Sequence, residues 1–171
     1  MKSPICDMLG IEFPLLAFTH CRDVVVAVSK AGGMGILGAV NLPPSALRQE
    51  LDWIDQNVGG KPYGIDLIVP NKFVGKDADA HDASGLRQMV PAEHLKYARD
   101  IMQRHGIEFD PSAQMEQSST FSENLRADAA ASSLEVAFEY PIKLVANALG
   151  VPPKVMLELG KQHNVPIAAL V

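Results

Sequence analysis

The sequence has 171 residues, of which 47% are hydrophobic and 20% are charged, the ordinary balance of a folded globular chain. This balance excludes collagen-like, coiled-coil and wholly disordered chains. Fifteen basic against twenty acidic residues give a net charge of −5, which argues against nucleic acid as a partner because phosphate backbones bind basic surfaces.

Cysteine usage and hydropathy indicate the compartment. Cys6 and Cys21 are too few for a disulfide framework and fit a reducing environment. No apolar run reaches the roughly 18 residues of a membrane span, and the first twenty residues lack the pattern of a signal peptide. We therefore expect a cytoplasmic protein that does not interact with membranes.

Over the first 70 residues, short apolar segments alternate with segments of helical character. Continuous apolar runs are typical of strands buried on both faces of a parallel sheet. We expect strands over 13–20, 34–40 and 63–69, with helices over 24–31 and 45–58 between them. No hairpin turn signal separates the strands, so this order predicts right-handed βαβ crossovers and a parallel sheet.

Both of these helices have recognisable features. Asp23 is the expected N-cap of the first helix, and Gly32 is the expected residue just beyond its end. The second helix has a clear amphipathic pattern, with its apolar side chains on one face. These apolar residues are Leu47, Leu51, Ile54 and Val58.

Residues 71–140 interrupt the alternation. The parts 71–90 and 110–133 are polar and have little periodicity, whereas 91–105 has the pattern of a helix. The residues expected to face inward from that helix are Leu95, Ala98, Ile101 and Met102. Because such long excursions are usually lids, partner-binding elements or disordered segments, we interpret 71–140 as an insertion within the domain.

The sheet pattern resumes near the end of the sequence. We expect a strand over 142–147, a helix from Pro153 to about His163 and a fifth strand over 165–171. Five strands with four crossovers fit either an open doubly wound sheet or part of a barrel. A complete eight-stranded barrel needs about 250 residues, and the pattern alone leaves the two alternatives open.

Several segments carry a resemblance to a known family. Residues 13–17 (Phe-Pro-Leu-Leu-Ala) and 26–38, which include Ala-Gly-Gly-Met-Gly-Ile-Leu-Gly, resemble the nitronate monooxygenase family, also called 2-nitropropane dioxygenase-like. Further matches lie at 63–67, 145–153 and 165–171. The glycine-rich block is shared with flavin-dependent enoyl reductases of a related barrel group.

The resemblance implies a fold and a set of partners. The family consists of FMN-dependent (β/α)8-barrel oxidoreductases with chains about twice as long. Residues 1–171 would then form one partial flavin-binding domain, the N-terminal part of an α/β TIM barrel with about five βα units. The insertion 71–140 would follow the third of its parallel strands. FMN, a small nitronate-like substrate and dioxygen are the implied partners, and a homodimer is one assembly that would cover the open sheet edges.

The resemblance also implies a cofactor site at the carboxyl ends of the strands, where barrel enzymes build their active sites. Ala17, Phe18 and Thr19 would line the flavin. Asp66 stands where many relatives have a flavin-contacting Asn. An Asp keeps the acceptors but loses the amide donor, and its charge would disfavour a reduced, anionic flavin. Alternatively, Asp66 pairs with a cation or caps a neighbouring element.

His20 and Asn147 are the candidate catalytic residues. His20 follows the first strand, and histidine is the side-chain type whose ordinary pKa suits a general base near neutral pH; the alternative is a loop histidine bonded to backbone carbonyls. Family members that oxidise nitronates have a catalytic His at the end of the fourth strand. Asn147 occupies that place here and would hydrogen-bond flavin or substrate without acting as a base. Cys21 is interpreted as an incidental thiol, and no residues have the spacing of metal ligands.

The implied function is FMN-dependent oxidation of nitronates or nitroalkanes by dioxygen, with the parent protein active and the isolated chain inactive. One alternative is an NAD(P)H-dependent flavin enoyl reductase of the same superfamily. Another is a truncated half barrel without catalytic activity.

Overall fold

A computed structural model describes residues 3–69, 90–108, 127–148 and 150–170. The chain divides into two compact units, one made of 1–71 with 124–171 and the other of 72–123. The sequence predictions that concern 70–89 and 109–126 lie outside the described residues. Of the second unit, the described part includes helix α5 (Ala92–Arg104).

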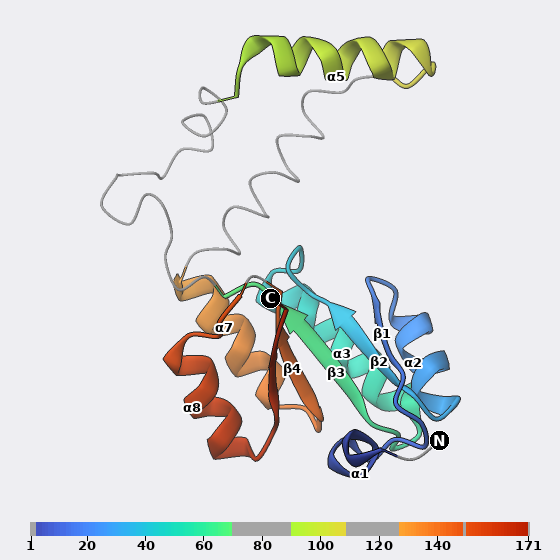
Figure 1. The fold of residues 1–171 in the computed structure, drawn as a ribbon, viewed down its shortest axis with the longest axis vertical. Coiled ribbons are helices and arrows are strands. Elements are labelled where there is room, and N and C mark those ends of the chain that lie inside the picture. Colours follow the sequence, from blue (N-terminus) through green and yellow to red (C-terminus); the bar gives the residue numbers. More distant parts are fainter. Residues whose placement is uncertain (1–2, 70–89, 109–126, 149, 171) are drawn as a thin grey trace. The chain divides into compact units, whose positions relative to one another are not determined.

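The first unit contains a five-stranded sheet in which every neighbouring pair of strands is parallel. The strand order follows the sequence, β1-β2-β3-β4-β5 (Figure 1). This arrangement confirms the predicted α/β class with parallel strands. The strands are β1 (Leu16–Thr19), β2 (Met34–Gly38), β3 (Tyr63–Leu67), β4 (Leu144–Asn147) and β5 (Ile167–Ala169).

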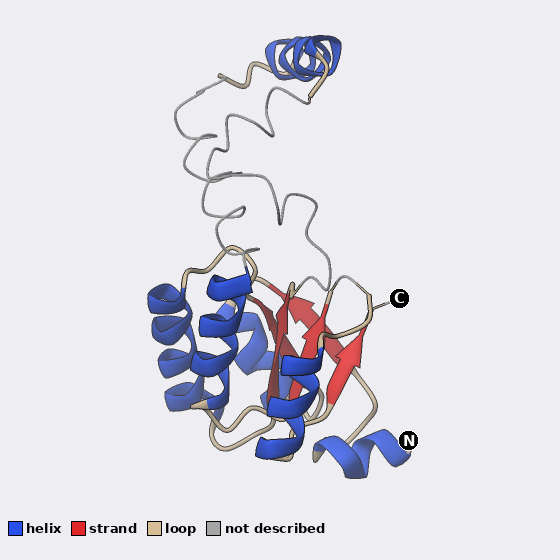
Figure 2. Cartoon of the chain, turned by 90° about the vertical axis from the view of Figure 1, so that its left-hand side faces the viewer, coloured by secondary structure: helices blue, strands red, loops and turns tan. Residues whose placement is uncertain are grey.

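Helices cover one face of the sheet in chain order, so that each contacts the next (Figures 1 and 2). A parallel sheet requires this layout, because every strand must be followed by a crossover that returns to the same end. The covering helices are α2 (Arg22–Lys30), α3 (Pro44–Val58), α7 (Ala127–Phe138) and α8 (Lys154–His163). None of the helices in the described ranges is both long and apolar enough to cross a bilayer.

The main core lies between the sheet and these helices. From α3, the four residues predicted on one face are all buried: Leu47, Leu51, Ile54 and Val58. Leu37, Ile65 and Val145 bury their side chains against the same core from β2, β3 and β4. Gly35 allows α2 to approach β2 closely, since a Cβ atom on Gly35 would lie 2.4 Å from the carbonyl oxygen of Val25.

The opposite face of the sheet carries a second, smaller cluster. The short helix α1 (Pro4–Leu9) lies at the end of the sheet where the strands begin (Figure 1). This cluster is made of Cys6, Leu9, Ile11, Met34, Ile36 and Leu144. We call this face the inner face. It is covered where the strands begin, and its other end, where the strands finish, carries the polar residues described below.

Two local predictions are wrong. The N-cap of α2 is Cys21 instead of Asp23, because the Cys21 backbone carbonyl already accepts hydrogen bonds from the N–H groups of Val24 and Val25. The inward face predicted for 91–105 is also absent, since α5 has no buried residue and Leu95 is 44% exposed.

One further prediction needs qualification. The part 110–133 was expected to lack periodicity, yet the helix α7 occupies 127–138 and contacts α3 and β3. Its buried side chains include Leu134 and Ala137. The helix α2 ends at Lys30 with Ala31 as its C-cap, so Gly32, which has a φ of 100°, is the residue just beyond the end, as predicted. The boundaries 71–140 of the insertion stay a prediction; α7 lies within them.

Candidate active site at the carboxyl ends of the strands

Strand register gathers a set of side chains on the inner face, near the ends of the strands. Side chains of a strand alternate between the two faces of the sheet. Gly38 and Asp66 therefore lie on the same face as Ile36, two residues before Gly38 on β2. Asp66 is the register partner of Gly38 on one side and of Ala146 on the other. Phe18 pairs with Ile36 and belongs to the same face.

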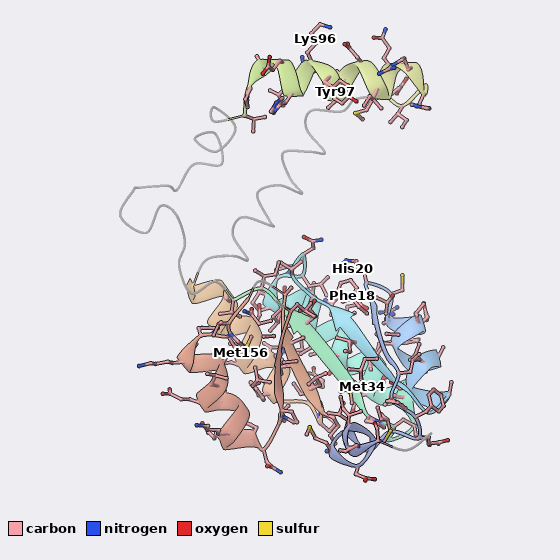
Figure 3. The ribbon with its side chains drawn as sticks, in the orientation of Figure 1. Phe18, His20, Met34, Lys96, Tyr97 and Met156 are labelled. Carbon is pink, nitrogen blue, oxygen red and sulfur yellow. The ribbon has the colours of Figure 1, made fainter. Side chains whose placement is uncertain are left out.

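Phe18 and His20 form one end of this group. The Phe18 ring is 56% exposed, an unusual exposure for a large apolar side chain within a strand. The two rings meet edge to face, with centroids 5.0 Å apart and an interplanar angle of 81°. Both side chains lie at the far end of the sheet from Met34 (Figure 3).

Gly38 lies beneath both rings. A Cβ atom at this position would stand 2.5 Å from Cζ of Phe18 and 2.9 Å from Cε1 of His20, closer than real side chains approach. The Gly38 carbonyl oxygen lies 2.9 Å from Nδ1 of His20. The glycine thus provides both the space that the rings occupy and a hydrogen-bond partner for the imidazole.

Asp66 contributes a buried carboxyl to the same face. It is 6% exposed, and within the described residues its Oδ1 atom has no hydrogen-bond partner. Burial raises the pKa of Asp66 to about 6, against the opposing effect of the nearby His20 charge. Because an unpaired buried oxygen costs free energy in the native state, Asp66 marks the position where a ligand donor would be most favourable.

The predicted residue Asn147 has a different environment. It shares register with Leu67, whose side chain belongs to the helix-covered core. Its buried Oδ1 atom accepts a hydrogen bond from the Val69 backbone N–H at 2.9 Å, and its Nδ2 atom donates to the Gly150 carbonyl at 3.0 Å. Asn147 thus ties the segment after β3 to the segment after β4.

Ala17 and Thr19 alternate with Phe18 and so face the helices. The Thr19 Oγ1 atom accepts a hydrogen bond from the Cys21 backbone N–H at 3.0 Å, which helps to form the turn into α2. A ligand on the inner face would therefore meet these two residues through their main chain. Of the predicted residues, the structure brings together Phe18, His20 and Asp66.

The contacts of Gly38 were not predicted. The sequence places this residue in the glycine-rich block, at a strand end 18 residues from His20. A separation of this size carries no signal for its contacts with Phe18 and His20. Within the described residues, no three side chains of the types His, Cys, Asp and Glu are grouped as a metal site would require.

Comparison with known proteins gives similarities over the full length of this chain. No family model matches it. A Mycobacterium tuberculosis protein named "Putative monooxygenase" is 42% identical over 172 residues, an alignment that covers 99% of this chain and 45% of the relative. A Staphylococcus saprophyticus protein named "Probable nitronate monooxygenase" is 21% identical, with coverage of 98% and 42%. The chain thus spans less than half the length of these relatives.

Solved structures agree with these relatives in fold. A nitroalkane oxidase from Streptomyces ansochromogenes superposes with a TM-score of 0.62 at 17% identity, covering 98% of this chain and 42% of its own. FabK from Thermotoga maritima superposes with a TM-score of 0.58 at 20% identity, covering 100% and 38%. The parallel sheet with its outer helices therefore matches part of the fold of each of these larger proteins. By sequence and fold together, this chain belongs to the nitronate monooxygenase-like family of oxidoreductases.

Proposed function

We propose that this chain provides the first five strands of an FMN-dependent oxidoreductase that oxidises nitronates or nitroalkanes with dioxygen. The observation that carries the proposal is the buried, unpaired Oδ1 atom of Asp66 on the inner face. In parallel α/β proteins, ligands bind at the ends of the strands, and a carboxyl without a partner at this place is suited to a ligand that donates a hydrogen bond.

The residues present fit the ring of a flavin. An isoalloxazine is flat and largely apolar, with one N–H donor on its pyrimidine ring. Asp66 would accept that N–H, and the exposed face of Phe18 would contact the apolar part of the ring. Gly38, without a side chain, lets the rings of Phe18 and His20 lie directly against the strand. Barrel enzymes commonly bind phosphate through loops after strands seven and eight, so this chain would contribute ring contacts.

The chemistry divides between the cofactor and the chain. When bound, FMN supplies the electron acceptor for substrate oxidation and passes the electrons to dioxygen. His20 would take a proton from the carbon beside the nitro group of a neutral nitroalkane, and its cationic form would pair with an anionic nitronate. Asn147 would act as a positioning residue, because it joins the segments after β3 and β4. Ala17 and Thr19 would border the flavin with their backbone.

Flavin binding and nitrite release test this proposal. The protein expressed from its own gene should be yellow, retain FMN after gel filtration and release nitrite from a nitronate in air. Asp66→Leu should lower FMN affinity about tenfold or more, the scale of a lost hydrogen bond to a charged group. Asp66→Asn retains an acceptor and should bind FMN, and exposed Asp55→Asn serves as the control. A colourless protein that takes up no FMN would overturn the proposal.

An NAD(P)H-dependent enoyl reductase is the second candidate. It is favoured by the absence of a histidine at the end of β4, where Asn147 stands. Rapid bleaching of bound flavin by NADH or NADPH without oxygen would identify the reductase, whereas a nitronate oxidase should react slowly. A third candidate is a non-catalytic half barrel. An intact mass of 18.4 kDa for the protein from its source, without flavin, would identify this form.

We also propose a location and an assembly. We infer a cytoplasmic protein, since both Cys6 and Cys21 are free thiols and free thiols persist in reducing compartments. A homodimer would cover exposed apolar residues at the two edges of the sheet, among them Leu16 and Leu170. Light scattering during gel filtration measures the assembly directly, and a monomeric mass would rule out the dimer.

A further inference from the structure

We propose that Gly38 is the positioning residue for His20: its carbonyl holds the imidazole in the tautomer protonated at Nδ1, and its missing side chain gives the ring its place. Nε2 is then the atom that accepts a proton. The inference rests on the proposed function only for the use made of Nε2, and the tautomer itself can be tested without flavin or substrate.

The hydrogen bond determines which nitrogen carries the proton. A neutral imidazole has one N–H donor and one acceptor nitrogen. The Gly38 carbonyl oxygen can only accept, so Nδ1, at 2.9 Å, must be the donor. Nε2 has no hydrogen-bond partner within the described residues and keeps its lone pair. In water the free side chain prefers the opposite tautomer, so the protein must impose this one.

The space at Gly38 is required for that hydrogen bond. A Cβ atom would lie 2.9 Å from Cε1 of His20 and 2.5 Å and 2.6 Å from two ring carbons of Phe18. Neither ring could stay where it is. The backbone of Gly38 has no positive φ, so alanine is conformationally acceptable there. A Gly38→Ala variant therefore tests the space beside the imidazole and leaves the backbone conformation allowed.

Phe18 also restricts the imidazole. Its ring meets that of His20 edge to face at 5.0 Å, and both rings lie against Gly38. Asp66, the register partner of Gly38, is the titratable neighbour on β3, and its interaction with His20 is through charge. Among the described hydrogen bonds of His20, the one to Gly38 alone selects a tautomer.

Long-range ¹H–¹⁵N NMR of the full chain tests the tautomer. With ¹⁵N-labelled histidine and a pH at which His20 is neutral, two-bond ¹H–¹⁵N correlations identify the protonated nitrogen of each ring, and His20→Gln assigns the signal. We expect His20 protonated at Nδ1, whereas His94 and His105 on and beside α5 should show mainly the Nε2–H form. A His20 signal in the Nε2–H form, or in the same mixture as the other two, would overturn the proposal.

Two variants separate positioning from general stability. Gly38→Ala should return His20 to the tautomer mixture of His94 and His105. Gly64→Ala, which adds a methyl group to the same face at a position whose Cβ would meet Leu144, should leave the His20 tautomer unchanged. If Gly38→Ala does not fold, the wild-type spectrum still decides the assignment. If Gly38→Ala folds and keeps the Nδ1–H form, Gly38 is not the positioning residue.

Reactivity provides an independent measurement. Diethyl pyrocarbonate acylates unprotonated imidazole nitrogen, so NMR of the modified ¹⁵N-labelled protein should find the added group on Nε2 of His20 in the wild type. Modification exclusively at Nδ1 would contradict the proposal. Because neither measurement uses flavin, an absence of FMN binding would remove the proposed function and leave the positioning of His20 standing.

Discussion

The buried carboxyl of Asp66 lies directly opposite Gly38 in the register of β3 and β2, next to a position that has no side chain. The rings of Phe18, on β1, and His20, just after it, occupy the space this leaves. A titratable group with an unpaired oxygen is thus placed beside the imidazole and within reach of a ligand on the inner face. Each of the following predictions concerns one part of this arrangement.

Asp66 should make stability depend on pH in an unusual direction. Its folded pKa, about 6, lies above the ordinary value of 3.8, so between these values the folded state holds more protons than the unfolded state. The stabilisation that comes from this extra bound proton is fully present below about pH 4 and is lost as the pH rises through 6. The free energy of unfolding should fall by up to about 3 kcal/mol over that range. Urea unfolding of wild type and Asp66→Asn from pH 4 to pH 8 measures it.

The free energy of unfolding of Asp66→Asn should therefore rise relative to that of the wild type as the pH rises. Asp23→Asn provides the control, since it makes the same chemical change at an exposed position. A constant difference between wild type and Asp66→Asn would show that Asp66 ionises in the folded state as it does in the unfolded chain.

Removing the amide of Asn147 should loosen the connection between the ends of β3 and β4. Asn147→Ala leaves the buried Val69 N–H without its acceptor and the Gly150 carbonyl without its donor, at a cost of about 1–3 kcal/mol. Asn147→Asp keeps an acceptor for the Val69 N–H, and it should destabilise the fold less than Asn147→Ala if the bond to Val69 is the stronger of the two. Hydrogen exchange at the Val69 amide is the local measurement, and unchanged protection in Asn147→Ala would contradict this role.

Close packing of α2 on β2 should make Gly35 intolerant of any side chain. Gly35→Ala would place Cβ 2.4 Å from the Val25 carbonyl oxygen, so the helix must move away from the strand. Overpacking of this kind costs about 1–3 kcal/mol, measurable by denaturant unfolding. Gln56→Ala, at an exposed position of α3, is the control, and equal stabilities of the two variants would refute the close approach.

Truncation of Phe18 should affect ligand binding more than folding. The ring is largely exposed, so Phe18→Ala gives up little buried area. If the ring contacts flavin, affinity should fall about 2- to 10-fold, the range of a single aromatic contact of 0.5–1.5 kcal/mol. Phe13→Ala, also at the surface but before β1, should leave affinity unchanged. Titration of flavin fluorescence in the protein expressed from its own gene compares the two.

The fold was largely predictable because its signals are local. The spacing of Leu47, Leu51, Ile54 and Val58 predicts a helix with one buried face, and that face is buried as expected. Alternation of such helices with apolar runs predicts parallel strands on topological grounds. The helix α7 escaped prediction because its alanines and serines carry little amphipathic contrast, and its burial depends on α3 and β3, which are distant in sequence.

The grouping of three candidate residues was predictable, and its local details were less so. Strand ends indicated that Phe18, His20 and Asp66 lie near one another, as they do, and their part in a site stays a prediction. The tautomer of His20 depends on a carbonyl 18 residues away, and the sequence pattern carries no signal for such a bond. Asn147 likewise lies on the expected strand, but its side chain is on the helix-covered face, and its amide bonds to the segments after β3 and β4. The face depends on the exact register, because a shift of one residue moves a side chain to the other face.

The packing of α1 against the sheet buries one of the two thiols. Cys6, 3% exposed, is packed with Met34 and Leu144 beneath the inner face, whereas Cys21 is at the surface. A thiol reagent added to the native chain should label Cys21 quickly and Cys6 only when α1 detaches from the sheet. The rate at which Cys6 is labelled therefore reports how often this end of the molecule opens. Mass spectrometry measures that rate without any engineered probe.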